Sequence, residues 1–259
     1  MKEIKAIDYS IWIGENSLSK LDISTYSKVA ILVDENTKRD CLFKLPQIEN
    51  ALIIEIKSGE EYKNISTCNF IWEQLTINNF DRNSLLINLG GGVIGDMGGF
   101  CAATYKRGLE FIHIPTTLLA MVDASVGGKL GIDFKGFKNQ IGLFNNPKAV
   151  LISSEFLETL AESELKSGFA EVVKHALISD NSLWLKLKNT PFTDLDWEDI
   201  IDTSVQIKNK IVLADPFEKG ERKKLNFGHT FGHAIESYYL EKRTPISHGE
   251  AVFMGMILE

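Results

Sequence analysis

A short strand that runs directly into a glycine-rich turn is the feature that most constrains the fold of this chain. Residues 83–89 (Asn-Ser-Leu-Leu-Ile-Asn-Leu) are typical of a short buried strand. Six glycines follow within ten residues, and Gly90, Gly92 and Gly95 fit the spacing G-x-G-x-x-G between a strand and a helix. Such glycines let backbone N–H groups approach a phosphate, and a helix N-terminus favours the anion. The stretch predicts a pyrophosphate site, with a tight turn needed only for packing as the alternative.

The remaining apolar runs divide the chain into two halves. Strands are expected at residues 28–33, 51–56, 83–89, 109–114 and 148–152, separated by helical or loop segments. From residue 154 onward every segment has helical period, including one continuous helix expected over 221–240. This pattern predicts an α/β N-terminal domain with a Rossmann-like parallel sheet over residues 1–153 and an all-α C-terminal domain over residues 154–259.

Two segments of the first half carry polar residues where a ligand would bind. Asp34 follows the first predicted strand, where an acidic side chain either takes a ribose hydroxyl pair or caps the next helix. Residues 120–140 combine Gly, Lys, Asp and Asn with little regular periodicity, which predicts an irregular binding loop.

Composition excludes several classes of protein. The net charge of −7 argues against a broad nucleic-acid-binding surface. The three cysteines are far apart, which favours a reducing compartment and argues against a cysteine metal site. No signal-peptide pattern and no run of about 18 apolar residues is present, so we expect a cytoplasmic protein that does not cross a membrane. Because residues 251–259 stop inside an apolar helical pattern, we expect either that the natural chain is longer or that this end packs in an unusual way.

Three histidines near the C-terminus predict a metal site. His229 and His233 are four residues apart in a helical segment, so both imidazoles lie on one face. His248 follows, and Glu171 is a candidate carboxylate ligand from another predicted helix. The alternative is a pair of ordinary helix histidines that satisfy local hydrogen bonds.

Five motifs together resemble the 3-dehydroquinate synthase family, a group of sugar-phosphate cyclases that are similar in fold to glycerol dehydrogenases. They are Gly-Gly-Gly-Val-Ile-Gly-Asp, Ile-Pro-Thr-Thr-Leu-Leu-Ala-Met-Val-Asp, Gly-Phe-Ala-Glu-Val-Val-Lys, Leu-Asn-Phe-Gly-His-Thr-Phe-Gly-His-Ala-Ile-Glu and His-Gly-Glu-Ala-Val, in this order. The resemblance implies a dehydroquinate synthase-like fold with tightly held NAD and a divalent metal, zinc or alternatively cobalt. It implies a small anionic phosphorylated keto-acid substrate and a homodimer. The implied reaction converts 3-deoxy-D-arabino-heptulosonate 7-phosphate to 3-dehydroquinate and phosphate in the shikimate pathway.

The resemblance also implies roles for individual residues. Its metal ligands match Glu171, His229 and His248, so that His233 faces the substrate instead of the metal. Its substrate or catalytic positions match Arg107, Asp123, Lys129, Asn139, Lys174, Lys208, Arg222, Asn226 and His233. Its NAD positions match Asp34, Asn36, Glu60, Lys63, Gly91, Gly92, Val93, Ile94, Gly95, Asp96, Thr116, Thr117, Lys129, Lys138, Phe156 and Thr159.

Three other functions remain open from the sequence. One is a related cyclase that acts on a sugar phosphate without a carboxylate, and another is a metal-dependent polyol dehydrogenase. The third is an NAD-binding scaffold without activity. The candidate cations argue against the dehydrogenase, because a polyol has no phosphate or carboxylate for them to neutralise. These cations are Arg107, Lys129, Lys138, Lys174, Lys208 and Arg222.

Overall fold

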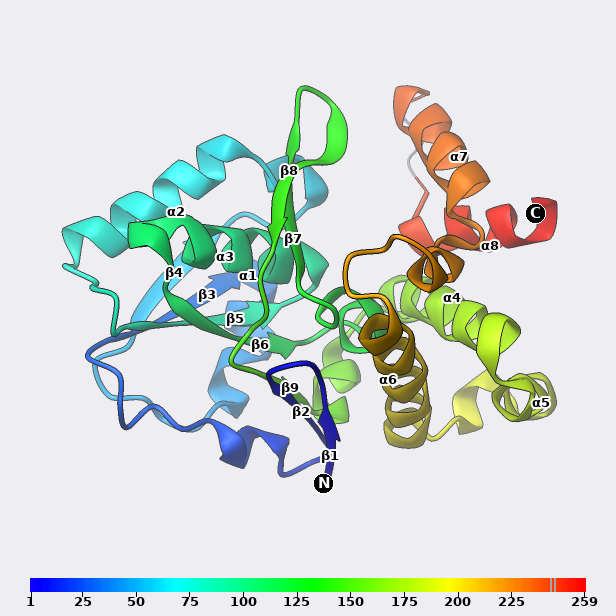
Figure 1. The fold of residues 1–259 in the computed structure, drawn as a ribbon, viewed down its shortest axis with the longest axis horizontal. Coiled ribbons are helices and arrows are strands. Elements are labelled where there is room, and N and C mark those ends of the chain that lie inside the picture. The colour runs from blue at the N-terminus through cyan, green and yellow to red at the C-terminus, as the bar shows by residue number, and fades with distance from the viewer. Residues whose placement is uncertain (243, 245) are drawn as a thin grey trace. The chain divides into compact units, whose positions relative to one another are not determined.

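The computed structural model describes residues 1–242, 244 and 246–259, and it divides them into two compact units (Figure 1). Unit 1 comprises residues 1–116 and 127–159, and unit 2 comprises residues 117–126 and 160–259. The short segment 117–126 therefore packs with the helical unit, although strands of unit 1 flank it in sequence. The single domain boundary expected between residues 153 and 154 stays a prediction.

Unit 1 is built on a seven-stranded, mostly parallel sheet with the order β1-β2-β9-β6-β5-β3-β4. Within this seven-stranded sheet, which lies wholly among the described residues, only the β1–β2 pair is antiparallel. All five strands expected from the sequence are present, whereas the four-residue strands β1 and β2 were not expected. The strands are β1 (Lys2–Lys5), β2 (Ser10–Ile13), β3 (Val29–Asp34), β4 (Leu52–Ile56), β5 (Leu85–Gly90), β6 (Glu110–Pro115) and β9 (Ala149–Ile152).

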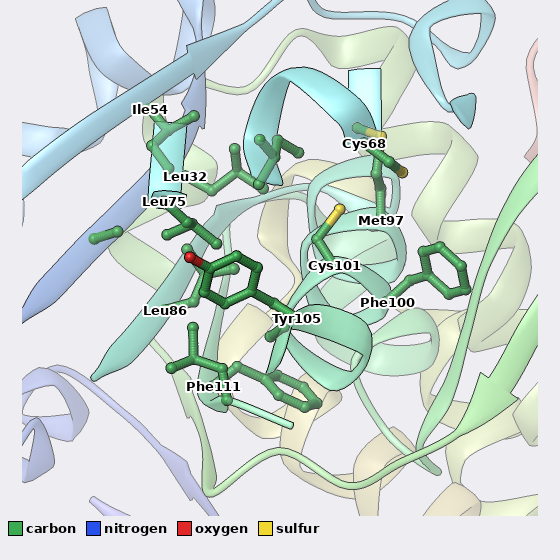
Figure 2. Packing of buried hydrophobic residues seen from close by; sticks show 14 of the residues in the cluster. Leu32, Ile54, Cys68, Leu75, Leu86, Met97, Phe100, Cys101, Tyr105 and Phe111 are labelled. Atoms are coloured by element: carbon green, nitrogen blue, oxygen red, sulfur yellow. The ribbon is translucent and has the colours of Figure 1, made fainter. Parts of the chain in front are cut away.

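Three helices of unit 1 follow strands of the sheet: α1 (Glu35–Asp40), α2 (Ile65–Ile77) and α3 (Gly92–Thr104). Figure 2 shows the core that α2 and α3 form with the sheet, where Leu75, Met97 and Leu86 are fully buried. Strand β5 runs directly into α3 through Gly91, so the expected strand, turn and helix are confirmed. The helix N-terminus thus lies at the carboxyl end of a buried parallel strand, where ligands of such sheets bind.

The segment 129–144 forms a β-hairpin, so the expectation of an irregular loop over residues 120–140 was wrong. Strands β7 (Lys129–Phe134) and β8 (Phe137–Phe144) pair antiparallel, and Gly131 lies opposite Gly142. Their turn is Lys135-Gly136, with φ values of 50° and 83°. A Lys-Gly turn is a weaker hairpin signal than Asn-Gly, and most of β8 is exposed, so no apolar alternation marks it. Residues 120–124 form a π-helical turn, η5 (Ala120–Ala124).

Unit 2 is helical, as expected. Its longer helices are α4 (Glu162–Ser179), α5 (Asn181–Asn189), α6 (Trp197–Ala214), α7 (His229–Glu241) and α8 (His248–Leu258). The one helix expected over 221–240 is instead a 3₁₀ segment, η8 (Glu221–Asn226), followed by α7. Gly228, with φ 80°, separates them because only glycine adopts this conformation without strain. Among the described residues, no helix combines the length and apolar character that a membrane crossing requires.

We expect Gly98→Ala to destabilise unit 1, whereas Gly95→Ala in the same helix does not. A Cβ at Gly98 would lie 2.0 Å from Asn88 Oδ1 and 2.7 Å from Leu32 Cδ2, so the packing of α3 on the sheet must shift. Overpacking of this kind costs about 1–3 kcal/mol. At Gly95 the nearest neighbour would be His113 at 3.7 Å, an ordinary contact. Denaturant unfolding measures both, and equal stability of the two variants would contradict this account of the packing.

Candidate active site

Glu171, His229 and His248 come together in unit 2 from three different helices. Glu171 Oε1 lies 3.8 Å from His229 Nε2 and 3.9 Å from His248 Nε2. One donor atom from each residue lies within 4.8 Å of the others, which is a distance that a single cation can bridge. Two imidazole nitrogens and one carboxylate oxygen are ligands of a catalytic zinc site that keeps an open position.

The atoms around the three residues support this interpretation. Glu171 Oε1 is buried and has no hydrogen-bond partner among the described residues. His248 Nδ1 lies 3.5 Å from Glu236 Oε2, and His229 Nδ1 lies 3.3 Å from the Phe227 carbonyl oxygen. Each histidine thus contacts an acceptor with one nitrogen and turns the other toward Glu171. Metal-ligating histidines are usually oriented in this way, so the residues present fit a divalent cation.

Glycines in unit 2 allow the helices to approach closely enough to form this cluster. Gly249, next to His248, would place a Cβ 2.2 Å from the Ser167 carbonyl oxygen on α4, and its N–H donates to Ser167 Oγ at 3.0 Å. Gly255 on α8 packs against Gly228, whose carbonyl oxygen would lie 1.9 Å from an added Cβ. A capping box that begins at Ser247 starts α8 directly before His248.

His233 lies beside this cluster and not within it. Its ring centroid is 5.3 Å from that of His229 and 6.0 Å from that of His248, and the residue is exposed. The i, i+4 spacing alone suggested His229 and His233 as neighbouring ligands. In the structure, the two imidazoles that lie near Glu171 Oε1 are those of His229 and His248. The assignment of these residues to a bound metal stays a prediction.

Two buried lysines and the half-buried Asp123 adjoin the cluster with charges of alternating sign. The Lys174 ammonium is hydrogen-bonded to Glu171 Oε2 and lies 3.9 Å from Asp123 Oδ1. Lys208 Nζ donates to Asp123 Oδ1 at 2.7 Å and to the Asp123 carbonyl oxygen at 2.5 Å. Glu171 and Lys174 are each only 1% exposed. The site can therefore offer two ammonium groups to an anion in a region of low dielectric.

The pKa values follow from burial and these neighbours. Burial alone would raise the pKa of Asp123, but Lys208 and Lys174 outweigh it and hold this pKa well below its ordinary value. Burial likewise opposes ionisation of Glu171, yet Lys174 lowers its pKa. Burial lowers the pKa of Lys208, although Asp123 partly offsets the effect. Both carboxylates are therefore ionised at neutral pH.

Two of the predicted nucleotide residues, Lys63 and Asp96, contact each other in unit 1. Lys63 Nζ, which is buried, donates to Asp96 Oδ2 and to Asn139 Oδ1, both at 2.7 Å. This network joins Asp96 of α3 to the β7–β8 hairpin. Asp34 caps α1 through a capping box with Thr37, so the alternative function weighed for Asp34 is present in the structure. Its proposed ribose contact stays a prediction.

The other predicted residues are divided between the units. Arg222 is buried and donates from Nη1 to the Pro216 carbonyl oxygen at 2.5 Å, and Asn226 donates to Glu218 Oε1 at 3.0 Å. Arg107 lies in a turn with φ 71°. Unit 1 also carries Asn36, Glu60, the stretch from Gly91 to Gly95, Thr116, Lys129, Lys138, Phe156 and Thr159, whereas Thr117 belongs to unit 2.

Comparisons with known proteins agree on one family. The sequence profile of the 3-dehydroquinate synthase N-terminal region matches residues 53–167, and that of the C-terminal region matches residues 168–259. The chain belongs to the 3-dehydroquinate synthase family. A 3-dehydroquinate synthase of Parabacteroides distasonis is 45% identical, and the match covers 90% of this chain and 68% of that protein.

Two further relatives define the range of the family resemblance. A bifunctional 3-dehydroquinate synthase/phosphatase of Fusobacterium nucleatum is 45% identical over 99% of this chain, which spans 40% of that protein. A crystal structure of 2-deoxy-scyllo-inosose synthase, complexed with carbaglucose-6-phosphate, NAD+ and Co2+, is 27% identical with a TM-score of 0.84. That match covers 99% of this chain and 73% of the other. The α/β unit followed by a helical unit is thus the fold of a dehydroquinate synthase-like cyclase.

Two residues near the cluster were not identified from the sequence. Glu236 lies seven residues after His229 and three after His233, so all three share one face of α7. That spacing is visible in the sequence, but a glutamate on a helix is usually a solvated surface residue, so nothing marked Glu236 as part of a site. His175 lies four residues after Glu171 on α4, and its neighbour Asp123 is distant in sequence, so no local pattern revealed it.

Removing one donor from the cluster should abolish zinc retention. We expect His229→Ala to lose stoichiometric zinc, because only one imidazole and one carboxylate would remain near Glu171 Oε1. Tyr238→Phe, at an exposed position on the same helix, is the matched control and should retain zinc. Metal analysis after gel filtration is the measurement. Stoichiometric zinc in His229→Ala would show that the assignment of this ligand is wrong.

Removing the carboxylate behind His248 should weaken metal binding without abolishing it. We expect Glu236→Ala to raise the dissociation constant for zinc about 10–100-fold, as for other carboxylates that orient a ligating imidazole. Glu236→Gln keeps an acceptor oxygen and should lie between this variant and the wild type. Competition with a chelator measures the constants, and an unchanged affinity in Glu236→Ala would remove Glu236 from the site.

Proposed function

We propose that this chain carries 3-dehydroquinate synthase activity, converting 3-deoxy-D-arabino-heptulosonate 7-phosphate to 3-dehydroquinate and phosphate. The observation that carries the proposal is the position of two buried ammonium groups beside the candidate metal ligands. Lys174 contacts the ligand Glu171, and Lys208 is tied to Asp123, which also lies 3.9 Å from Lys174. A substrate with a carboxylate and a phosphate requires such cations, whereas a polyol does not.

The site would hold two groups that the chain itself does not supply. When bound, a divalent metal would supply a Lewis acid for a substrate hydroxyl, and NAD would supply a reversible hydride acceptor, which is the chemistry that elimination of phosphate without net redox requires. Glu171, His229 and His248 would hold the metal, with zinc as our choice. Cobalt is the alternative, and the related 2-deoxy-scyllo-inosose synthase structure contains Co2+ together with NAD+. NAD would lie on unit 1, with its pyrophosphate at the N-terminus of α3.

The residues of unit 2 would bind and orient the substrate. Lys174 and Lys208 neutralise its anionic groups, and their burial strengthens each interaction because water screens it less. Asp123 accepts a hydrogen bond from a substrate hydroxyl, since its low pKa keeps it an acceptor at neutral pH. In unit 1, Lys63 holds Asp96 and Asn139 in fixed positions beside the glycine-rich turn. The assembly of both sets into one pocket is part of the proposal.

Two expectations about the protein in the cell belong with this proposal. A homodimer and a location in the cytoplasm are inferred from the resemblance and from the sequence, respectively. Sedimentation at several concentrations would test the first, and fractionation of cells would test the second.

Product analysis tests the proposed activity. With the seven-carbon keto-acid phosphate as substrate, we expect one equivalent of phosphate for each substrate consumed and no net NADH. Net NADH without phosphate would instead identify a polyol dehydrogenase. Phosphate release only from a sugar phosphate that lacks a carboxylate would identify another cyclase, and either result overturns the proposal.

Removing the Lys208 ammonium should reduce turnover. We expect Lys208→Met to lower kcat/KM about 10–100-fold, the loss expected for a charge-assisted hydrogen bond of about 1.5–3 kcal/mol. Lys210→Met, at an exposed position on the same helix, is the matched control and should retain the wild-type value. Phosphate release measures both variants. Equal rates would remove Lys208 from the substrate site.

A further inference from the structure

His175 is a fully buried histidine that the proposed reaction does not use. It lies on α4 with 0% of its surface exposed, and neither ring nitrogen has a hydrogen-bond partner among the described residues. A buried polar group without a partner is uncommon and costs free energy, so a structure that keeps one requires a reason. The position of His175 suggests such a reason, because its Nε2 lies 3.7 Å from Asp123 Oδ1.

The same oxygen of the Asp123 carboxylate has a closer partner. Lys208 Nζ is only 2.7 Å from the same oxygen, whereas the 3.7 Å to His175 is too long for a hydrogen bond. Burial lowers the pKa of His175, so its ring is neutral at neutral pH and carries one N–H. Asp123 Oδ1 is therefore held by an ammonium in this structure, and a shift of less than about 1 Å would bring the imidazole within hydrogen-bond distance of it.

We propose that His175 is a positioning residue for Asp123. When Lys208 turns toward an anionic group of the substrate, His175 Nε2–H donates a hydrogen bond to the Asp123 carboxylate in its place. This inference rests on the proposed function of Lys208 in substrate binding. Without a second donor, an Asp123 carboxylate released by Lys208 would lose one charge-assisted hydrogen bond beside the incoming anion, and its side chain is only 26% exposed. His175 supplies the replacement and fixes the carboxylate where it can orient a substrate hydroxyl.

Two simpler explanations make different predictions. His175 could fill the core as a phenylalanine would, although a phenyl ring would leave no unpaired nitrogens. His175, Asp123 and Glu171 also bring three donor atoms within 4.8 Å, as a second metal site requires. The ammonium groups of Lys174 and Lys208 already occupy both carboxylates, however, and would repel a divalent cation there.

Three variants at position 175 test the inference in the complete chain. His175→Phe keeps the approximate shape and removes the donor, whereas His175→Gln places an amide N–H near the position of Nε2. Asp123→Asn, alone and combined with each of them, completes a double-mutant cycle. We expect His175→Phe to lower kcat at least about 10-fold with a smaller change in KM, and His175→Gln to recover most of the loss.

The second measurement does not depend on the substrate. In the unfolding equilibrium, we expect the effects of His175→Phe and Asp123→Asn to be coupled by a factor of at least about 3, because the imidazole and the carboxylate are close neighbours, 3.7 Å apart, even without substrate. Additive effects together with an unchanged kcat in His175→Phe would show that His175 only fills the core. A second zinc equivalent that wild type binds and His175→Phe loses would show that it is a ligand. If wild type released no phosphate, the proposed function would fail, and the unfolding cycle would still decide the role of His175.

Discussion

The buried carboxylate of Glu171 is the constraint on which the helical unit depends. An ionised carboxylate that is 1% exposed loses nearly all of its hydration, at a cost of several kcal/mol unless both oxygens gain partners. Oε2 receives the Lys174 ammonium, whereas Oε1 has only the more distant imidazoles of His229 and His248. Oε2 is thus paired with an ammonium, whereas Oε1 has no hydrogen-bond partner among the described residues and is available to a cation.

The packing of unit 2 brings the partners of Glu171 into place. Helix α8 approaches α4 at Gly249 and approaches the start of α7 at Gly255, so that His248 and His229 reach the same oxygen. At each glycine, even a methyl group would meet the backbone of the neighbouring helix. These positions are therefore set by backbone contact, which is stiffer than contact between flexible side chains, and small changes there should alter the ligand geometry.

Much of the architecture could be predicted from the sequence because local patterns encode it. Short apolar runs marked five of the six parallel strands of unit 1, and the glycine-rich turn after β5 marked the start of α3. The hairpin β7–β8 was missed because its second strand is exposed, which removes the apolar alternation that identifies strands. The break before α7 was missed because helical period continues on both sides of Gly228, whose positive φ no periodicity can reveal.

The candidate site was harder to predict from the sequence because its contacts join residues that are far apart in the chain. Motifs identified the three donors, but helical spacing alone paired His229 with His233. Asp123 contacts Lys208 across 85 residues, and the interest of His175 follows only from its position beside that pair.

The central claim is that Glu171, His229 and His248 bind a divalent metal. X-ray absorption at the zinc edge of the zinc-loaded protein tests it most directly. We predict two imidazole nitrogens at about 2.0–2.1 Å and one carboxylate oxygen at about 2.0–2.2 Å from the zinc, and we predict that Glu171→Ala loses the carboxylate oxygen. Three imidazole ligands, or an unchanged spectrum in Glu171→Ala, would contradict this assignment of the ligands.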